Sequence, residues 1–152
     1  MNSGPVRKLF FPVSLVLSGA MLFIAFIPVL GFSRNEPLLH IAGKFIAGKL
    51  CHTDPSKIPS VLGHNLFLCS RCSGIYAGAF LTGLLVLPAG YLTKFKLKNP
   101  LRIPLAMLLP MAADVLLYNS GIYSYNFTIA WFTGFLSGSG VILYIWNDFF
   151  QN

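Results

Sequence analysis

The sequence predicts an all-α integral membrane protein with four transmembrane helices and one interfacial amphipathic helix. Hydrophobic residues make up 55% of the 152-residue chain and charged residues only 10%, and the mean hydropathy is +0.71. Soluble domains carry roughly 25% charged residues, so this composition excludes an ordinary soluble domain. The apolar residues also fall in runs of about 20, the length that crosses a bilayer as a helix. We therefore expect a single membrane domain that covers residues 1–152.

Four apolar runs account for the predicted spans, which cover about residues 11–32, 73–92, 101–118 and 127–146. The first run is far longer than the roughly 7 to 15 apolar residues of a cleaved signal peptide, so we expect it to remain in the protein as an anchor. The segment of about residues 33–72 is the longest polar stretch, and we expect it to lie outside the membrane.

An amphipathic helix is predicted within this extramembrane segment, over residues 37–50. Its apolar residues recur at helical spacing, whereas His40, Lys44 and Lys49 lie mostly on other faces. A helix this short and this charged does not span a bilayer, but it can lie in the headgroup region. The residues that follow, 53–65, contain Asp54, two prolines, two serines and Gly63, and these predict irregular backbone.

Glycines recur in the second and fourth predicted spans with the four-residue spacing of close-packing membrane helices. Gly74 and Gly78 lie in the second span, and Gly134 and Gly138 lie in the fourth. Because these positions lack a Cβ atom, a neighbouring helix can approach them closely. The two glycine faces are therefore candidate surfaces for close helix packing, and for contact with a second copy of the chain or another membrane protein.

The net charge of +7 indicates membrane-flanking segments and not a nucleic-acid site. The basic residues fall at the edges of the apolar runs and do not form an array interleaved with aromatic residues. The lipid bilayer is therefore the expected partner. Lysines and arginines gather between residues 94 and 102, as in cytoplasmic loops. This favours a multi-pass protein of the cell membrane with both termini in the cytoplasm, although the basic residues of segment 33–72 favour the opposite orientation.

Three cysteines and a histidine are gathered in the extramembrane segment, as Cys51-His52 and as the C-x-x-C pair of Cys69 and Cys72. A C-x-x-C pair supplies two thiolates from one tight turn, and tetrahedral zinc takes four soft or borderline ligands. Cys51 offers a third sulfur, and either His52 or His64 offers the fourth ligand. These residues predict a Cys3His site at one membrane face that holds one metal ion per chain, with zinc as the expected metal.

Two other interpretations use the same cysteines. Cys69 and Cys72 precede a predicted helix whose dipole stabilises a thiolate, so they could serve as the dithiol of a membrane thiol-disulfide oxidoreductase, with Cys51 as a resolving thiol. A structural disulfide, or small buried side chains without further chemistry, is the third interpretation. The residues alone leave all three open.

Three further polar residues are accessory candidates. Asp114 is the only acid inside a predicted span, and an ionisable group in lipid must face a cavity, pair with another group or stay protonated. It makes a small transporter or a metal-handling protein an alternative function. Arg71 could cap this acid, activate a thiol or extend to the headgroups. Tyr76 lies one helical turn beyond Cys72, within reach of the site.

The cysteine region resembles the signature of domain of unknown function 2085, a family of small prokaryotic multi-pass membrane proteins. The family pattern reads C-H, a spacer and then C-x-R-C-x-G-I-Y-x-G, which Cys51-His52 and residues 69–78 match. The likeness extends to six later positions: Pro110, Asp114, Asn126, Thr133, Gly134 and Gly138. Val115 and Ala130-Trp131 stand where the family carries a glycine and an arginine, so no role of that arginine is carried over to this chain.

The resemblance implies a membrane fold with a cysteine-histidine site, and it favours His52 over His64 as the fourth ligand. It implies no activity. The chain also lacks several familiar catalytic and cofactor motifs, namely G-x-S-x-G, H-E-x-x-H, the Walker loop and the C-x-x-C-H haem attachment. The sequence therefore assigns no catalytic residue, no organic cofactor and no substrate.

Overall fold

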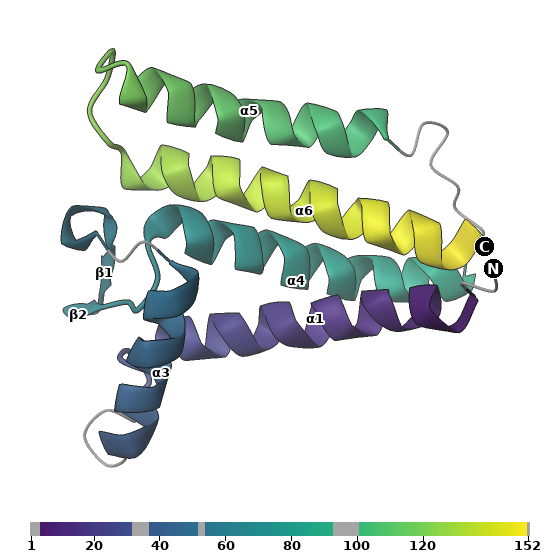
Figure 1. The fold of residues 1–152 in the computed structure, drawn as a ribbon, viewed down its shortest axis with the longest axis horizontal. Coiled ribbons are helices and arrows are strands. Elements are labelled where there is room, and N and C mark those ends of the chain that lie inside the picture. The colour runs from purple at the N-terminus through teal and green to yellow at the C-terminus, as the bar shows by residue number, and fades with distance from the viewer. Residues whose placement is uncertain (1–3, 32–36, 52–53, 93–100, 152) are drawn as a thin grey trace.

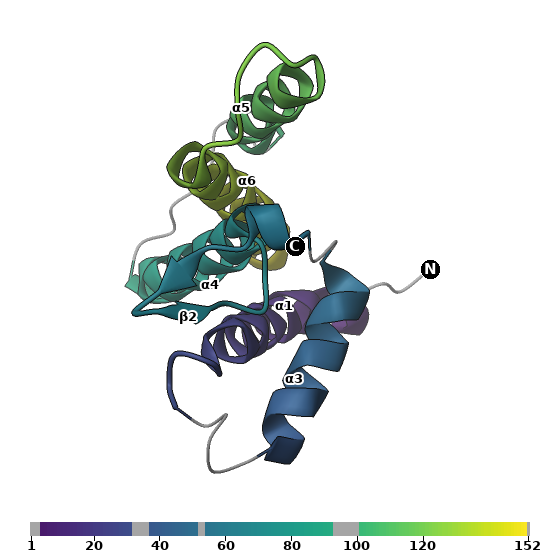
Figure 2. The ribbon, with the colours of Figure 1, turned by 90° about the vertical axis from the view of Figure 1, so that its left-hand side faces the viewer.

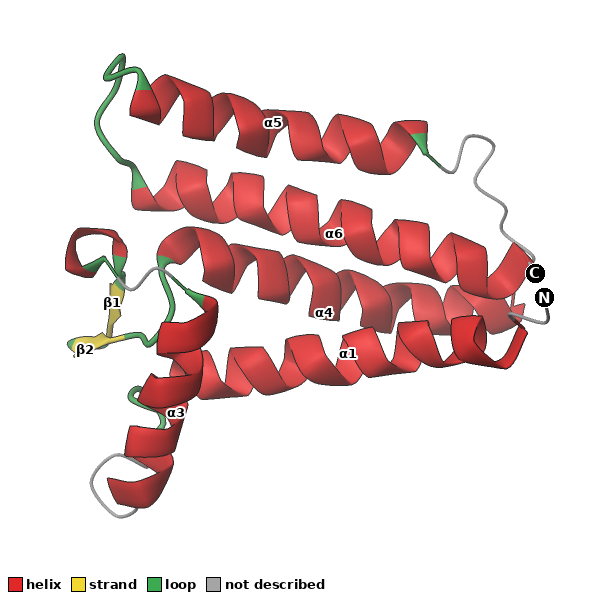
Figure 3. Cartoon of the chain, viewed as in Figure 1, coloured by secondary structure: helices red, strands yellow, loops and turns green. Residues whose placement is uncertain are grey.

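The computed structural model describes residues 4–31, 37–51, 54–92 and 101–151, and most of these are helical (Figure 3). The helices are α1 (Gly4–Phe26), α3 (Pro37–Leu50), α4 (Ser70–Leu92), α5 (Arg102–Asn119) and α6 (Phe127–Gln151). A short 3-10 helix (Pro55–Lys57) and the strands β1 (Ser60–Val61) and β2 (His64–Asn65) complete the described elements. The predicted predominance of helix is confirmed.

Four long helices lie side by side in the order α1, α4, α6 and α5 (Figures 1 and 2). α4 and α6 run in the same direction, because Gly134 faces Arg71 and Gly138 faces Ile75, four residues further along each helix. α1 and α5 run in the opposite direction (Figure 1). As a result, α1 begins and α6 ends at one end of the bundle, and α4 begins at the other.

Three of the described helices contain stretches long and apolar enough to cross a membrane: Leu9–Phe26 of α1, Ser70–Pro88 of α4 and Phe127–Asn147 of α6. They correspond to the first, second and fourth predicted spans. The third predicted span, residues 101–118, coincides with α5, which is not among the three. Arg102 and Asn119 at the ends of α5, and Asp114 inside it, lower its hydropathy.

The first predicted span extended to residue 32, whereas α1 ends at Phe26. The N–H groups of Val29 and Leu30 both donate to the Phe26 carbonyl, at 3.0 and 3.1 Å, in a turn that closes the helix. Pro28 lacks the N–H that a further helical turn needs, and Gly31 takes a φ of 77°, the left-handed conformation common after helix ends. The helix therefore ends earlier than its apolar composition predicted, although Ile27 stays buried against the end of α1.

We call residues 37–51 and 54–69 the cap segment. The predicted helix over residues 37–50 is confirmed as α3, which lies steeply across the end of the bundle (Figures 1 and 2). A buried apolar cluster joins the cap segment to the end of α1: Met21, Ala25, Ile27, Ala47, Cys51, Phe67 and Leu68. The Phe67 N–H also donates to the Ala25 carbonyl at 3.4 Å. The cap segment is thus packed onto the bundle directly beside Cys51.

A small antiparallel hairpin lies within the stretch that was predicted to be irregular. β1 pairs with β2 through Ser60 with Asn65 and Val61 with His64. Leu62 and Gly63 form the two-residue loop, with φ angles of 52° and 79°. Positive φ at both positions is the geometry of a type I′ turn, which matches the twist of the paired strands.

The glycine faces of α4 and α6 pack against each other. A Cβ atom at Gly78 would lie 2.1 Å from the Phe135 carbonyl oxygen, and one at Gly138 would lie 2.0 Å from that of Ile75. Real Cβ atoms essentially never come within 3.0 Å of such an atom, so the two backbones are in direct contact. The predicted close packing is confirmed. The faces meet within one chain, however, and are covered, so they do not offer the surface for a second copy or another membrane protein that the sequence suggested.

Candidate metal centre

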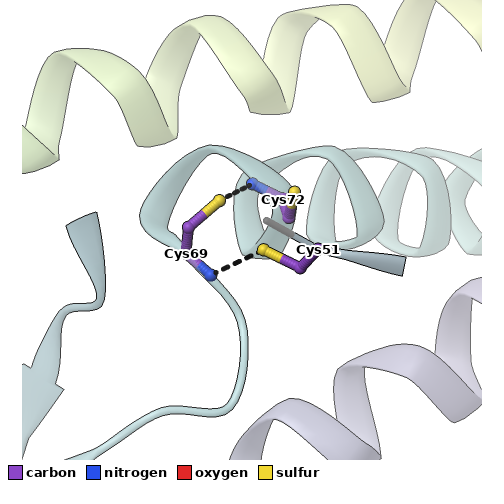
Figure 4. Close-up of side chains that lie close together, drawn as sticks. All are labelled: Cys51, Cys69 and Cys72. Carbon is purple, nitrogen blue, oxygen red and sulfur yellow. Dashed lines mark hydrogen bonds between the residues drawn. The ribbon is translucent and has the colours of Figure 1, made fainter. Parts of the chain in front are cut away.

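The three cysteine sulfurs converge where the cap segment meets the bundle (Figure 4). Their Sγ atoms all lie within 4.8 Å of one another. All three are free cysteines, of which Cys51 is buried and Cys69 and Cys72 are half-buried. In a tetrahedral zinc site with Zn–S bonds of about 2.3 Å, neighbouring sulfurs are about 3.8 Å apart. The cluster is therefore close to the spacing that a shared metal ion requires.

Two helix ends hold these sulfurs in place. Cys51 directly follows α3, and its N–H still donates to the Ala47 carbonyl at 2.8 Å. Cys69 directly precedes α4, where its carbonyl accepts the Ser73 N–H at 3.0 Å and its sulfur accepts the Cys72 N–H at 3.4 Å. The Cys69 sulfur thus takes the place of the side-chain oxygen that usually caps a helix N-terminus. Its position is fixed by the geometry of the first turn of α4.

Backbone groups favour negative charge at the cluster. The Cys69 sulfur accepts the Cys72 N–H, and the Cys51 sulfur accepts the Cys69 N–H at 3.4 Å. The N-terminus of α4 adds its positive dipole end. The pKa of the Cys69 thiol nevertheless lies above its ordinary value, because its interaction with the Cys51 sulfur and its burial outweigh its hydrogen bonds with Cys72. Sulfurs this close cannot all ionise without a cation between them, and a bound metal ion would supply that charge.

An ion pair anchors the C-x-x-C turn to α5. Arg71 lies between the two cysteines, and its Nη2 donates to Oδ2 of Asp114, whose side chain is 2% exposed. The Tyr123 hydroxyl donates to Oδ1 of the same carboxylate. Both carboxylate oxygens are thus engaged. Of the roles predicted for Arg71, capping the acid is the one that the geometry supports.

Tyrosines surround the ion pair on the side of the cap segment. The Arg71 guanidinium lies over the Tyr125 ring, 5.8 Å from its centroid. Burial away from water raises the pKa of Tyr125 to about 12. The sequence analysis missed Tyr123 and Tyr125, although both lie in the polar connection that precedes the last predicted span. Tyr76 packs against the buried cluster that contains Cys51.

Of the two histidines predicted as the fourth ligand, His52 and His64, the structure describes only His64. His52 lies outside the described residues. His64 is exposed on β2, and among the described residues the cluster of ligand atoms contains the three cysteines without it. The third histidine, His40, packs edge-on against Phe67 with ring centroids 4.8 Å apart. The structure therefore gives no support to His64 as a ligand.

Comparison with known families supports the membrane assignment. The chain matches the family described as "Predicted membrane protein (DUF2085)" over residues 51–144, which is more than half of its length. The chain belongs to this family. The resemblance inferred from the cysteine signature is confirmed, and the DUF2085 match contains the whole sulfur cluster and the Arg71–Asp114 pair, whereas α1 and α3 precede it.

Two relatives are similar to this DUF2085 chain. An uncharacterised protein of Methanocaldococcus jannaschii is 34% identical over 103 residues, which cover 67% of this chain and 65% of the relative. An uncharacterised protein of Methanothermobacter thermautotrophicus is 31% identical over 94 residues, which cover 60% of this chain and 80% of the relative. The chain thus spans slightly less than two thirds of the first relative. Neither name states an activity, and no solved structure matches the chain.

Proposed function

We propose that this chain is a four-pass membrane protein whose cap segment is fixed to the bundle by a zinc centre of Cys51, His52, Cys69 and Cys72. The observation that carries the proposal is the convergence of three sulfurs within 4.8 Å from two separate helix ends. Three thiolates and one imidazole are a donor set that zinc takes in closed, structural sites. Such a centre would join the end of α3 to the start of α4.

The centre would act mainly on folding. The Cys51 and Cys69 positions are 18 residues apart, and the described part between them contains one 3-10 turn and a hairpin of two strands with two residues each. Because this part of the chain has little regular structure, it forms few backbone hydrogen bonds. A bound metal ion would therefore contribute much of what keeps it ordered. In zinc-finger peptides, metal binding contributes about 10–16 kcal/mol that is also folding free energy.

His52 is the proposed fourth ligand because it directly follows Cys51 and because α3 has ended at Leu50. Adjacent residues on a regular helix point about 100° apart, so both side chains can reach one ion only beyond a helix end. His64 is the alternative ligand. Its exposed position on β2 argues against it.

A thiol-disulfide oxidoreductase is the second candidate function, and the position of Cys69 before the N-terminus of α4 favours it. In that reaction the Cys69–Cys72 dithiol would be oxidised to a disulfide while a substrate disulfide takes up two electrons and two protons and becomes two thiols, and Cys51 would be the thiol that resolves a mixed disulfide with the substrate. The zinc centre accounts better for three sulfurs that lie mutually close, because a disulfide needs only two of them.

A transporter that uses Asp114 is the third candidate, and the engagement of both carboxylate oxygens by Arg71 and Tyr123 argues against it. We assign Asp114 a positioning role instead. It holds Arg71, and through Arg71 it holds the turn that carries Cys69 and Cys72.

The direction of the helices supports α5 as the fourth crossing. α4 and α6 both begin at the end of the bundle that carries the cap segment and run the same way (Figure 1). If both cross the membrane, the chain between them must cross back, and α5 is the helix that does so. The pairing of Asp114 with Arg71 lowers the cost of placing that acid in lipid. With the lysine-rich connection of residues 94–102 in the cytoplasm, both termini are cytoplasmic and the zinc centre lies on the outer face.

Thiol labelling separates the zinc centre from the oxidoreductase. The full-length protein in mild detergent would be treated with a maleimide alone, after a zinc chelator, after a reductant, and after both. The zinc centre predicts that chelation without reductant exposes all three thiols. Labelling that requires reductant and does not respond to the chelator would contradict the zinc centre and support the disulfide.

A further inference from the structure

A basic cavity of about 520 Å³ lies between α3 and the hairpin, with no cysteine among its lining residues. Its walls include His40, Lys44 and Gly48 from α3, and Ile58, Asn65 and Phe67 from the chain around the hairpin. Sites for small ligands have volumes of roughly 300–1,000 Å³ and combine apolar walls with a few polar groups. This cavity has both properties, and neither the zinc centre nor the ion pair uses it.

The polar groups of the cavity are suited to an anion. Lys44 brings an ammonium group, Asn65 an amide and His40 an imidazole, and among the described residues no acid lines the cavity. Asp54 lies next to the lining residue Pro55 in sequence, but its carboxylate is occupied by Ser56 and Lys57. The ring of His40 is held against Phe67, and its Nδ1 has no hydrogen-bond partner among the described residues. The cavity therefore carries positive charge that the described protein does not neutralise.

The position of the cavity on α3 identifies the kind of anion. Residues 40, 44 and 48 form one stripe, because they are four residues apart on a helix. Gly43 and Ala47, on one side of that stripe, are packed against the bundle. On its other side α3 exposes a row of large apolar side chains: Leu38 (78% exposed), Ile41 (66%) and Phe45 (67%). The stripe that carries His40 and Lys44 thus borders an exposed apolar surface, which is more stable in contact with lipid chains than with water.

We propose that this cavity binds the phosphate-containing headgroup of an anionic phospholipid, whose acyl chains lie along Leu38, Ile41 and Phe45. Lys44 supplies the charge and hydrogen-bond donors for the phosphate, and Asn65 supplies the amide donor from the opposite wall. A free phosphate ion shares the headgroup chemistry but makes no use of the apolar row. The site would hold the cap segment at the membrane surface independently of the zinc centre.

Binding of short-chain lipids, below their micelle concentration, tests the proposal on the full-length protein. Equilibrium dialysis in detergent would compare phosphatidylglycerol, phosphatidylcholine of the same chain length, and inorganic phosphate. We expect phosphatidylglycerol to bind, phosphatidylcholine to bind more weakly and inorganic phosphate not to compete. Competition by inorganic phosphate at the same concentration would overturn the lipid assignment and leave a phosphate site.

Two lysines of α3 provide a matched pair of variants. Lys44→Gln removes the charge from the cavity and should weaken phosphatidylglycerol binding about tenfold, the effect of losing one charge-assisted hydrogen bond. Lys49→Gln removes a charge from the same helix, where the ammonium lies over the Phe45 ring, outside the cavity lining. It should leave binding within about twofold, because a screened surface charge contributes little. Equal losses in both lysine variants would overturn the proposed site in favour of general surface charge. Asn65→Ala removes the amide donor from the opposite wall without a change of charge and should also weaken phosphatidylglycerol binding.

Discussion

Gly134→Ala should disturb the metal centre from the neighbouring helix. A Cβ atom at residue 134 would lie 2.4 Å from the carbonyl oxygen of Arg71, the residue between the two cysteines of the C-x-x-C turn. Ordinary van der Waals contact begins at 3.4 Å, so the first turn of α4 must move by about 1 Å relative to α6. Metal sites hold their ligand distances to about 0.2 Å. We therefore expect zinc affinity to fall at least about tenfold, together with about 1–3 kcal/mol of stability from overpacking.

Competition with a chromophoric chelator measures the affinity, and thermal unfolding followed by circular dichroism measures the stability. Gly48→Ala is the control for the added methyl group, since a Cβ atom there meets no atom of the described residues within 4 Å. It should leave both properties unchanged or raise stability slightly. Gly138→Ala creates the same kind of overlap one turn further from the cysteines, against Ile75, so it should cost stability with a smaller loss of affinity. Wild-type zinc affinity in Gly134→Ala would refute the reasoning.

Three further predictions concern the ion pair, Tyr125 and the topology. Asp114→Asn leaves the Arg71 guanidinium without its counter-ion and should lower the free energy of unfolding, measured by thermal unfolding, by about 3–5 kcal/mol. The double variant Arg71→Met with Asp114→Leu should recover much of this loss, because no charge is left unpaired. Equal losses in the single and double variants would contradict a buried pair. The Tyr125 hydroxyl should ionise near pH 12 in the folded protein, against about 10 in an unfolded chain. Because the folded-state pKa is raised, the contribution of Tyr125 to stability is present below pH 10 and is lost as the pH rises toward 12. A pH titration followed by tyrosinate absorbance at about 295 nm, with Tyr125→Phe as the reference, measures this ionisation. A titration midpoint near pH 10 for Tyr125 would contradict the raised pKa. Fluorescent proteins fused to either terminus should both fluoresce in the cytoplasm; reporters that place the termini on opposite sides would contradict four crossings, and periplasmic activity at both termini would contradict the proposed orientation.

The sequence was sufficient for features that depend on local pattern. α3 follows from apolar spacing and was predicted with its observed ends. The cysteines were recognised because a C-x-x-C before an apolar helix is a local signal. That Cys51 would approach them was an inference from chemistry, and the observed spacing of the sulfurs agrees with it.

Other features depend on contacts between distant parts of the chain. The four-residue glycine spacing predicted a close helix neighbour, but nothing local identifies α6 as the neighbour of α4. The partners of Asp114 were also undetermined, because the acid is 43 residues from Arg71. The early end of α1 was missed for a different reason. Apolar composition continues past Phe26, and the backbone limits set by Pro28 and Gly31 override it.

Elemental analysis of the purified full-length protein, prepared without chelators, tests the zinc centre most directly. The zinc centre predicts about one zinc atom per chain in the wild type, loss of that zinc in Cys51→Ser, Cys69→Ser and His52→Ala, and retention in His64→Ala. A wild-type protein without stoichiometric metal would contradict it, and so would zinc content that is unchanged when Cys51 is replaced.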